Sequence, residues 1–274
     1  MKSAIIQVDK GVFMTFKEWF FGGNSAINPE FSNPRVEMQW KLPHILVLLS
    51  CIALIVGIAF LFRKKNEKAR KIVLWVMVGI ILLFEITRRV KNVIAMCITD
   101  SVTFNKLLHD LLPRPWCAIS CWSLIIAAIF KKKCLYNISS IMALLCAVIF
   151  FAYPGAGFNN VYIYEFENLY SIITHSMLLV TSISLITLKF ADFKYKNMWK
   201  ELICLAVIYI YACLEIWVLK IEGDPLYFMP GGDIQDILGV GNAVYVIIYI
   251  IFLTFFVNMF YLIGDRKRVF RKRK

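Results

Sequence analysis

Four side chains that can take part in acyl transfer or proton transfer lie within apolar stretches of the sequence. Cys117 carries a thiol, His175 an imidazole, and Glu85 and Glu215 carboxylates. An imidazole can take the proton of a thiol and leave a thiolate able to attack an ester, while a carboxylate orients the imidazole. Cys117, His175 and Glu215 are therefore predicted as a catalytic set. Packing of Cys117 with Cys121, four residues on, stays open as the alternative role.

Three arginines near these groups predict a binding site for a lipid phosphate. Arg88 and Arg89 follow Glu85 by about one helical turn, and Arg114 lies three residues before Cys117. A guanidinium binds a phosphate through two parallel hydrogen bonds. Arginines at helix ends also extend toward the membrane interface without binding a ligand, and this second role stays open for each of them.

The sequence does not predict a metal site or a nucleotide-binding site. It has neither a Cys-x-x-Cys pair nor a pair of histidines at metal-binding spacing, and its paired glycines do not follow a predicted strand. No metal or other cofactor is therefore expected. Most of the cysteines fall inside apolar stretches, which excludes a secreted type of disulfide framework: Cys51, Cys117, Cys121, Cys146, Cys204 and Cys213.

The elements that must position these groups are membrane-spanning helices. Hydrophobic residues make up 60% of the 274 residues and charged residues 18%, so the chain has too little polar surface for a soluble globule. Windows of about 20 apolar residues match the thickness of a bilayer. They predict an all-α, polytopic transmembrane bundle of seven spans: 44–62, 72–87, 112–130, 136–153, 166–188, 199–219 and 238–263. An extension of the second span through Val90 stays open, and so does a count of six, because the fourth span is short.

The basic residues predict the orientation of this bundle. The net charge of +13 comes from short blocks between apolar stretches, which favours a membrane and its lipids as partners over a nucleic acid. Seven spans with the amino terminus outside and the carboxyl terminus in the cytoplasm place every block inside: 63–71, 131–133, 189–200 and 266–274. The four reactive side chains then all lie in the outer half of the membrane.

The same pattern predicts three regions. Residues 1–41 form an extracytoplasmic interfacial arm rather than a cleavable signal sequence, 42–264 the transmembrane bundle, and 265–274 a basic cytoplasmic tail. Richness in Ile, Lys and Asn indicates a bacterial plasma membrane. Protein partners are not predicted.

Three stretches carry a resemblance to a known family. The run from Leu112 to Cys117, Leu-Pro-Arg-Pro-Trp-Cys, is similar to the Leu-Pro-Leu-His-Leu-Cys signature of the YwaF-like bacterial membrane proteins, relatives of the transmembrane protein 164 family. His175 follows a proline-containing outer loop as in that family, and residues 224–228 with 239–245 resemble its final motif. Pro115 replaces the signature histidine, Asp224 replaces an asparagine, and residues 240–243 lack the Pro-Trp-Pro core.

This resemblance implies an enzyme of lipid metabolism. A eukaryotic branch of the family is implicated in moving acyl chains between phospholipids, with the signature cysteine as acyl acceptor and the membrane histidine as its partner. Carried over, Cys117 is the nucleophile and His175 the base of a phospholipid acyltransferase.

Two other functions stay open. A transporter or solute-binding membrane protein would line a polar path with Glu85, His175 and Glu215, because ionisable groups inside a membrane often mark a substrate path. A sensor or assembly partner would use the acidic loop of residues 222–236. An enzyme predicts Cys117 and His175 close together, whereas a transporter predicts a continuous polar cavity.

Overall fold

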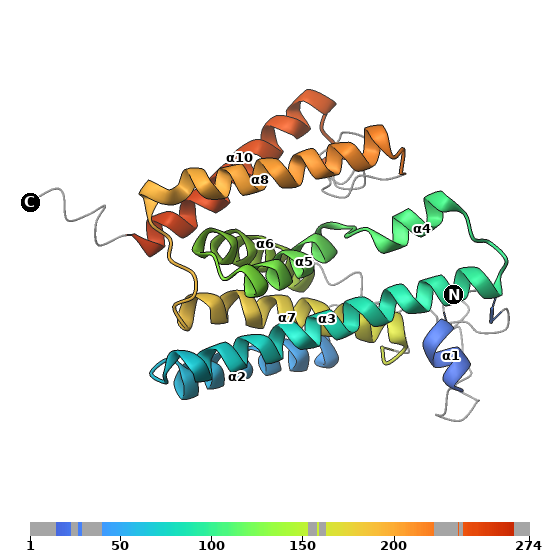
Figure 1. Cartoon of the computed structure of the whole chain (residues 1–274), viewed down its shortest axis with the longest axis horizontal. Helices are drawn as coiled ribbons and strands as arrows, with labels where there is room; N and C mark the ends of the chain where they lie inside the picture. Colours follow the sequence, from blue (N-terminus) through green and yellow to red (C-terminus); the bar gives the residue numbers. More distant parts are fainter. Residues whose placement is uncertain are drawn as a thin grey trace, which may run out of the picture.

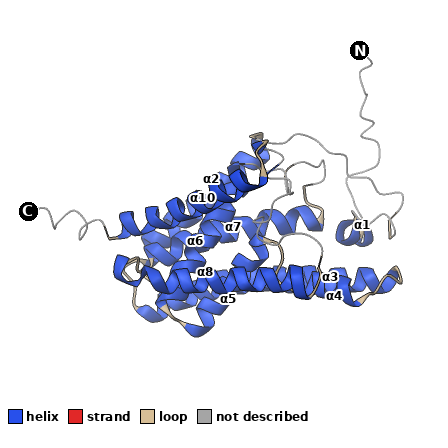
Figure 2. Cartoon of the chain, turned by 90° about the horizontal axis from the view of Figure 1, so that it is seen from above, coloured by secondary structure: helices blue, strands red, loops and turns tan. Residues whose placement is uncertain are grey.

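The computed structural model describes residues 15–22, 27–28, 40–152, 158, 163–221, 235 and 238–265. Within these ranges the chain consists of helices and their connections, without strands (Figure 2). The predicted all-α class is thereby confirmed for the described part. The basic tail from Arg266 onward, residues 224–228 and most of the predicted acidic loop lie outside the described residues.

The described helices follow one another along the chain. Their bounds are α1 Phe16–Phe21, α2 Leu42–Phe62, α3 Glu67–Ile98, α4 Phe104–Leu111, α5 Trp116–Phe130, α6 Lys133–Ala152, α7 Phe166–Thr187, η1 Tyr195–Asn197, α8 Met198–Cys213, η2 Leu214–Val218 and α10 Asn242–Gly264.

Helices α6 and α7 form the centre of the bundle. They pack against each other, with α5 and α8 against α6, and α2 and α3 against α7. Figure 1 shows α8 with α10 along one edge of the bundle and α2 with α3 along the opposite edge. Buried residues make up 72% of the apolar segment of α6 and 67% of that of α7, but only 6% of that of α2. The outer helices therefore present long apolar faces suited to lipid.

Length and composition identify several of these helices as membrane spans. Five segments are long and apolar enough: α2, α6, α7, the segment Tyr195–Val218 and α10. The α4–α5 pair makes a sixth if it counts as one bent span. Helix α3 is longer than any of them, with 32 residues, but carries Glu85, Arg88 and Arg89 in its interior. The polytopic character is confirmed, while seven spans and the orientation stay predictions.

The third predicted span begins later than expected. Residues 112–130 were expected to form one helix, but α5 starts at Trp116, and α4 and α5 meet at an angle of 58°. Pro113 and Pro115 explain the break, because proline lacks an N–H donor and disfavours a helical conformation of the residue before it. Cys117 is consequently the second residue of a helix rather than an interior position.

Helix α3 extends beyond its predicted bounds in both directions. The predicted span was 72–87, with an extension through Val90 left open. Asn66 instead caps the start of the helix by accepting a hydrogen bond from the Ala69 amide at 2.9 Å. Beyond residue 87 the helix continues through Arg88, Arg89 and Lys91, because acidic partners neutralise two of these charges. A hydropathy window does not register such pairing, so it ended the helix too early.

Short helix α1 lies against the opposite end of α7 from the basic connections. Thr15 and Glu18 form a capping box at its start, and the Trp19 indole donates to the carbonyl of Tyr164 at 2.8 Å. The Phe20 and Phe166 rings are 5.1 Å apart. These contacts fix α1 beside the start of α7, the helix that carries His175.

At the end of the bundle with the basic connections, Asn137 ties α6 to α8. Its side chain donates to Glu201 at 2.7 Å and accepts from the backbone N–H of Asp192 at 2.8 Å. Burial raises the pKa of Asp192, but hydrogen bonds from Lys194 and Lys133 outweigh burial and hold that pKa below its usual value. The network anchors the connection between α7 and α8.

Candidate acyl-transfer site

The structure brings Cys117 and His175 together. The Cys117 side chain lies near the His175 ring, the Cys146 thiol and the Arg88 guanidinium, all within electrostatic range of its sulfur. These residues come from α5, α7, α6 and α3, so four helices that are far apart in sequence meet at one thiol. No other described cysteine has this combination of an imidazole, a second thiol and a guanidinium around it.

The orientation of His175 is fixed from both sides. Its Nδ1 lies 2.7 Å from the carbonyl of Ser171, one turn earlier on α7. Its ring stacks on Phe150 with centroids 3.9 Å apart and an interplanar angle of 8°. Because a carbonyl only accepts hydrogen bonds, Nδ1 carries the proton and donates it. The Nε2 atom of the neutral ring is then left with a lone pair that can accept the proton of a thiol.

The start of α5 supplies a favourable environment for a thiolate. Cys117 follows Trp116 in the first turn, and the amide of Ile119 is the first to bond within the helix, to the carbonyl of Pro115 at 3.1 Å. The amides of Cys117 and Ala118 thus have no intrahelical acceptor. Unpaired amides and the helix dipole stabilise negative charge at this position.

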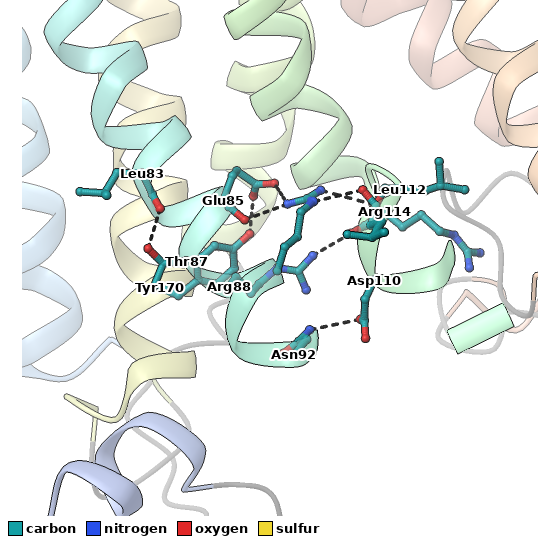
Figure 3. Close-up of polar contacts among 11 residues, drawn as sticks. Leu83, Glu85, Thr87, Arg88, Asn92, Asp110, Leu112, Arg114 and Tyr170 are labelled. Atoms are coloured by element: carbon teal, nitrogen blue, oxygen red, sulfur yellow. Dashed lines mark hydrogen bonds and ion pairs between the residues drawn. The ribbon is translucent and has the colours of Figure 1, made fainter. Parts of the chain in front are cut away.

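A buried ion pair lies within α3, in electrostatic range of Cys121 on α5. Glu85 is fully buried, accepts a hydrogen bond from Arg89, and accepts another from the Tyr170 hydroxyl of α7 at 2.5 Å. Figure 3 shows Tyr170 and Arg114 on either side of the Glu85 carboxylate. A buried charge is costly unless it is paired and hydrogen-bonded, and here both conditions are met.

Arg89 also holds the break between α4 and α5. Its Nε donates to the carbonyl of Leu111 at 3.2 Å and its Nη2 to that of Leu112 at 3.5 Å, while its guanidinium lies 5.4 Å from the Trp122 ring centroid. The last carbonyls of a helix need such outside donors. Arg89, which was predicted to bind substrate, therefore has a structural role. Its N–H donors are already hydrogen-bonded to Glu85 and to the carbonyls of Leu111 and Leu112.

Arg88, unlike Arg89, has an N–H donor that could bind a ligand. Its guanidinium lies 5.3 Å from the Tyr170 ring centroid, and its Nη2 donates to the carbonyl of Arg114 at 3.4 Å. Its buried Nε has no hydrogen-bond partner among the described residues. Among the three arginines predicted to bind substrate, Arg88 is the one that lies beside Cys117 and keeps a donor unused.

Arg114 and Glu215 form a second buried pair. The Arg114 Nε lies 2.9 Å from a Glu215 carboxylate oxygen, and both side chains are almost completely buried. Glu215 belongs to the π-helix η2, one turn after Tyr211 of α8. The carboxylate expected to orient His175 is therefore paired with Arg114, and the Ser171 carbonyl holds the histidine ring instead. The pair connects η2 to the residue three before Cys117.

Several residues of the site escaped the sequence analysis. Cys146 was assigned only to a span, and Tyr170, Ser171 and Phe150 received no role. Two of the contacts have a signal in the sequence: Ser171 precedes His175 by four residues, and Cys146 precedes Phe150 by four, so each pair shares a helix face. The sequence contains no comparable signal for which faces of different helices pack together. In the described ranges, no three His, Cys, Asp or Glu side chains converge as a metal site.

Fold and site together define a polytopic α-helical membrane protein with a thiol, an imidazole and a half-buried arginine, Arg88, meeting between its helices. The TMEM164 family model matches residues 39–263, which is most of the chain. The chain therefore belongs to the TMEM164 family, and the predicted family relation is confirmed. Neither a curated protein nor a solved structure matches it.

Proposed function

We propose that this protein is a membrane acyltransferase that moves a fatty acyl group between lipids through a thioester on Cys117. The observation that supports this most directly is that Cys117 lies near His175, whose Nδ1 is held by the Ser171 carbonyl, which leaves Nε2 with a lone pair that can accept a proton. The resemblance implies a role in lipid chemistry, since a eukaryotic branch of the family is implicated in moving acyl chains between phospholipids.

The proposed setting is a bacterial plasma membrane crossed seven times, with membrane lipids as donor and acceptor. Helix α3 and the bent α4–α5 pair then add to the five helices that are apolar enough to span. In the proposed orientation residues 1–41 lie outside and 265–274 in the cytoplasm. Cys117 then lies in the outer half, next to the connection between α4 and α5.

The first half-reaction acylates the enzyme. His175 Nε2 takes the proton of Cys117, and the thiolate attacks the ester carbonyl carbon of a donor lipid. The amides of Cys117 and Ala118 are placed to stabilise the oxyanion of the tetrahedral intermediate. The intermediate collapses with cleavage of the carbon–oxygen ester bond, and the departing lipid alcohol takes the proton from His175.

The second half-reaction returns the enzyme to its starting state. His175 removes the proton from a hydroxyl of the acceptor lipid, whose oxygen attacks the thioester carbonyl. The carbon–sulfur bond breaks, and the Cys117 thiolate recovers the proton from His175. One ester is consumed and one is formed, so no cofactor is needed.

Reconstitution in lipid nanodiscs tests this function. The donor is a phosphatidylcholine with an alkyne-tagged acyl chain, and the acceptor is a lysophospholipid, with product lipids separated by mass spectrometry. We expect tagged acceptor and a transient label on Cys117 that neutral hydroxylamine removes, as it does from thioesters. Absence of both products with choline, ethanolamine and glycerol head groups would contradict acyl transfer.

The transporter alternative has weaker support. Its predicted polar path requires Glu85, His175 and Glu215 to face a shared route, but Glu85 is engaged by Arg89 and Tyr170 and Glu215 by Arg114. Carboxylates held in this way are poorly placed to exchange protons or bind a solute in turn.

His175→Gln is expected to lower the rate of Cys117 acylation by about 10²- to 10⁴-fold, the range that general base catalysis contributes. Glutamine keeps a polar side chain of similar length but cannot take up the thiol proton. The rate is measured in a single turnover with the tagged donor. The same substitution at His109, an exposed residue of α4, provides the control and is expected to leave the rate unchanged. Equal rates for the two variants would exclude His175 as the base.

Arg88→Gln is expected to raise the KM for a phospholipid donor about tenfold, because a charge-assisted hydrogen bond to the phosphate is lost. A diacylglycerol donor separates this role from a structural one, since it carries an ester but no phosphate. Its KM should be the same for the variant and the unmodified protein. A parallel loss with both donors would indicate that Arg88 shapes the site rather than binding phosphate.

A further inference from the structure

The segment of residues 112–115, which leads into α5, is held by α3 through its backbone. Arg89 Nη2 donates to the carbonyl of Leu112 at 3.5 Å, and Arg88 Nη2 donates to that of Arg114 at 3.4 Å. The segment contains two prolines, which lack N–H donors, and α5 begins without a hydrogen bond from a capping side chain. The position of the segment therefore depends on contacts with neighbouring helices.

On its other side, the segment is held by η2 through a side chain. The Arg114 Nε lies 2.9 Å from a Glu215 carboxylate oxygen, and the two side chains are 6% and 1% exposed. Figure 3 shows the Arg114 side chain pointing away from Arg88, which contacts the Arg114 backbone. Separating a buried ion pair leaves uncompensated charges, so the pair strongly resists a displacement of either partner. The segment is thus fixed between α3 and η2.

The carboxylate of Glu215 comes from an unusual turn. The Leu219 N–H bonds to the carbonyl of Leu214, five residues earlier, at 3.0 Å. Such π-turns are rare in helices and frequently occur at functional sites. The apolar part of the segment Tyr195–Val218 is only 17% buried, and Trp217 is 66% exposed, yet Glu215 is completely buried. A span that mostly faces outward therefore directs one carboxylate inward, onto Arg114.

We propose that Glu215 is a positioning residue that holds Cys117 in place through Arg114. This inference rests on the proposed use of Cys117 as the nucleophile. Arg114 lies three residues before Cys117, so a shift of the segment moves the thiol relative to His175 on α7. Misplacement of a reacting group by about 1 Å can lower a rate about 10²-fold. Glu215, which was predicted to orient His175, acts on the nucleophile instead.

The ion pair contributes a defined position rather than stability. Two apolar side chains of similar volume would avoid the cost of removing both charges from water, so packing alone does not require the pair. Glu215 touches neither the thiol nor the acyl group in the proposed reaction. It exchanges no proton, and the stoichiometry of both half-reactions is unchanged.

Single-turnover acylation of the full chain in nanodiscs tests this role, with unfolding by sodium dodecyl sulfate measured in parallel. Three variants are compared with the unmodified protein: Glu215→Gln, Glu201→Gln, and the double variant Arg114→Met with Glu215→Leu. Glu201 is the matched control, because it lies in the same span, is 1% exposed and accepts a hydrogen bond from Asn137 at 2.7 Å. The same chemical change is thus made at the opposite end of the span.

We expect Glu215→Gln to lower the acylation rate about 10- to 100-fold, because the charge that holds Arg114 is lost. The loss should be equal for phospholipid and diacylglycerol donors, since the thiol and not the phosphate site is displaced. Glu201→Gln should stay within about threefold of the unmodified protein. The double variant should regain stability, because no buried charge is unpaired, but should remain slow.

The double variant keeps the test decisive even if Glu215→Gln fails to fold. Recovery of the acylation rate together with stability in the double variant would overturn the proposal, because the pair would then contribute to folding alone. Equal rates for Glu215→Gln and Glu201→Gln would also overturn it.

Alkylation of Cys117 by iodoacetamide at pH 7 separates this proposal from the proposed function. Glu215→Gln should slow alkylation about tenfold, because a displaced thiol loses the groups that favour its thiolate, whereas Glu201→Gln should not. If this difference is found but the unmodified protein is never acylated, the positioning role is correct and the acyltransferase function is wrong. If the unmodified protein is acylated and Glu215→Gln alters neither rate, Glu215 has only a packing role.

Discussion

Cys117→Ser is expected to abolish the hydroxylamine-sensitive acyl adduct and to lower acyl transfer in nanodiscs by about 10³-fold or more. The sulfur of Cys117 lies near the oriented imidazole of His175 and is able to form a thioester. A serine hydroxyl is a much weaker nucleophile at neutral pH, and an ester formed on it resists neutral hydroxylamine. Both transfer and adduct are measured by mass spectrometry.

Cys121→Ser is the matched control for this variant. Cys121 lies on the same helix one turn later and is completely buried, so the same atom is exchanged at a similar depth. Its transfer rate should stay within about threefold of the unmodified protein, the usual scatter for a conservative change away from the chemistry. If Cys117→Ser keeps most of the activity, or if Cys121→Ser loses as much, the nucleophile has been assigned to the wrong residue.

Arg89→Ala is expected to destabilise the folded protein by about 3 to 5 kcal/mol, the usual cost of removing one partner of a buried ion pair. The substitution leaves the fully buried Glu85 without its cation and removes the donors that hold the carbonyls of Leu111 and Leu112. Unfolding of the purified protein by sodium dodecyl sulfate, followed by circular dichroism, measures the loss of stability.

Two further variants show whether the ion pair is the cause. Lys71→Ala removes the pair with Glu67, which has the same four-residue spacing on α3 but is exposed, and should leave stability unchanged. The double variant Glu85→Leu with Arg89→Met should regain much of the loss, because no buried charge is then left unpaired. If Arg89→Ala behaves like Lys71→Ala, the Glu85–Arg89 pair is not essential to the fold.

The tertiary structure also separates three arginines that the sequence treats alike. Arg89 completes the end of α4 and neutralises Glu85, Arg114 pairs with Glu215, and Arg88 keeps a donor beside the thiol. Removing Arg89 or Arg114 should therefore reduce stability first, whereas removing Arg88 should alter the use of phospholipid at unchanged stability. Whether a given arginine contributes to stability or to substrate binding depends on which helix its guanidinium contacts.

The sequence alone determines that this protein is an all-helical membrane protein. Long apolar windows allow no other structure in a bilayer, because only a helix satisfies all its backbone hydrogen bonds within one segment. The family relation, too, depends on short signatures read directly from the chain, and the run that ends at Cys117 gave both the family and the candidate nucleophile. Cys117 and His175 were identifiable because reactive groups are rare in apolar stretches.

The tertiary structure decides what surrounds those groups. Hydropathy does not indicate which side chains surround Cys117, but packing of α6 against α5 and α7 places His175 and Cys146 near its sulfur. Glu215 was expected beside His175 from its depth, yet depth does not define the direction in which a helix face points, and it pairs with Arg114. Periodicity along one helix is encoded locally, whereas contacts between helices depend on their rotation and packing, which a single sequence leaves open.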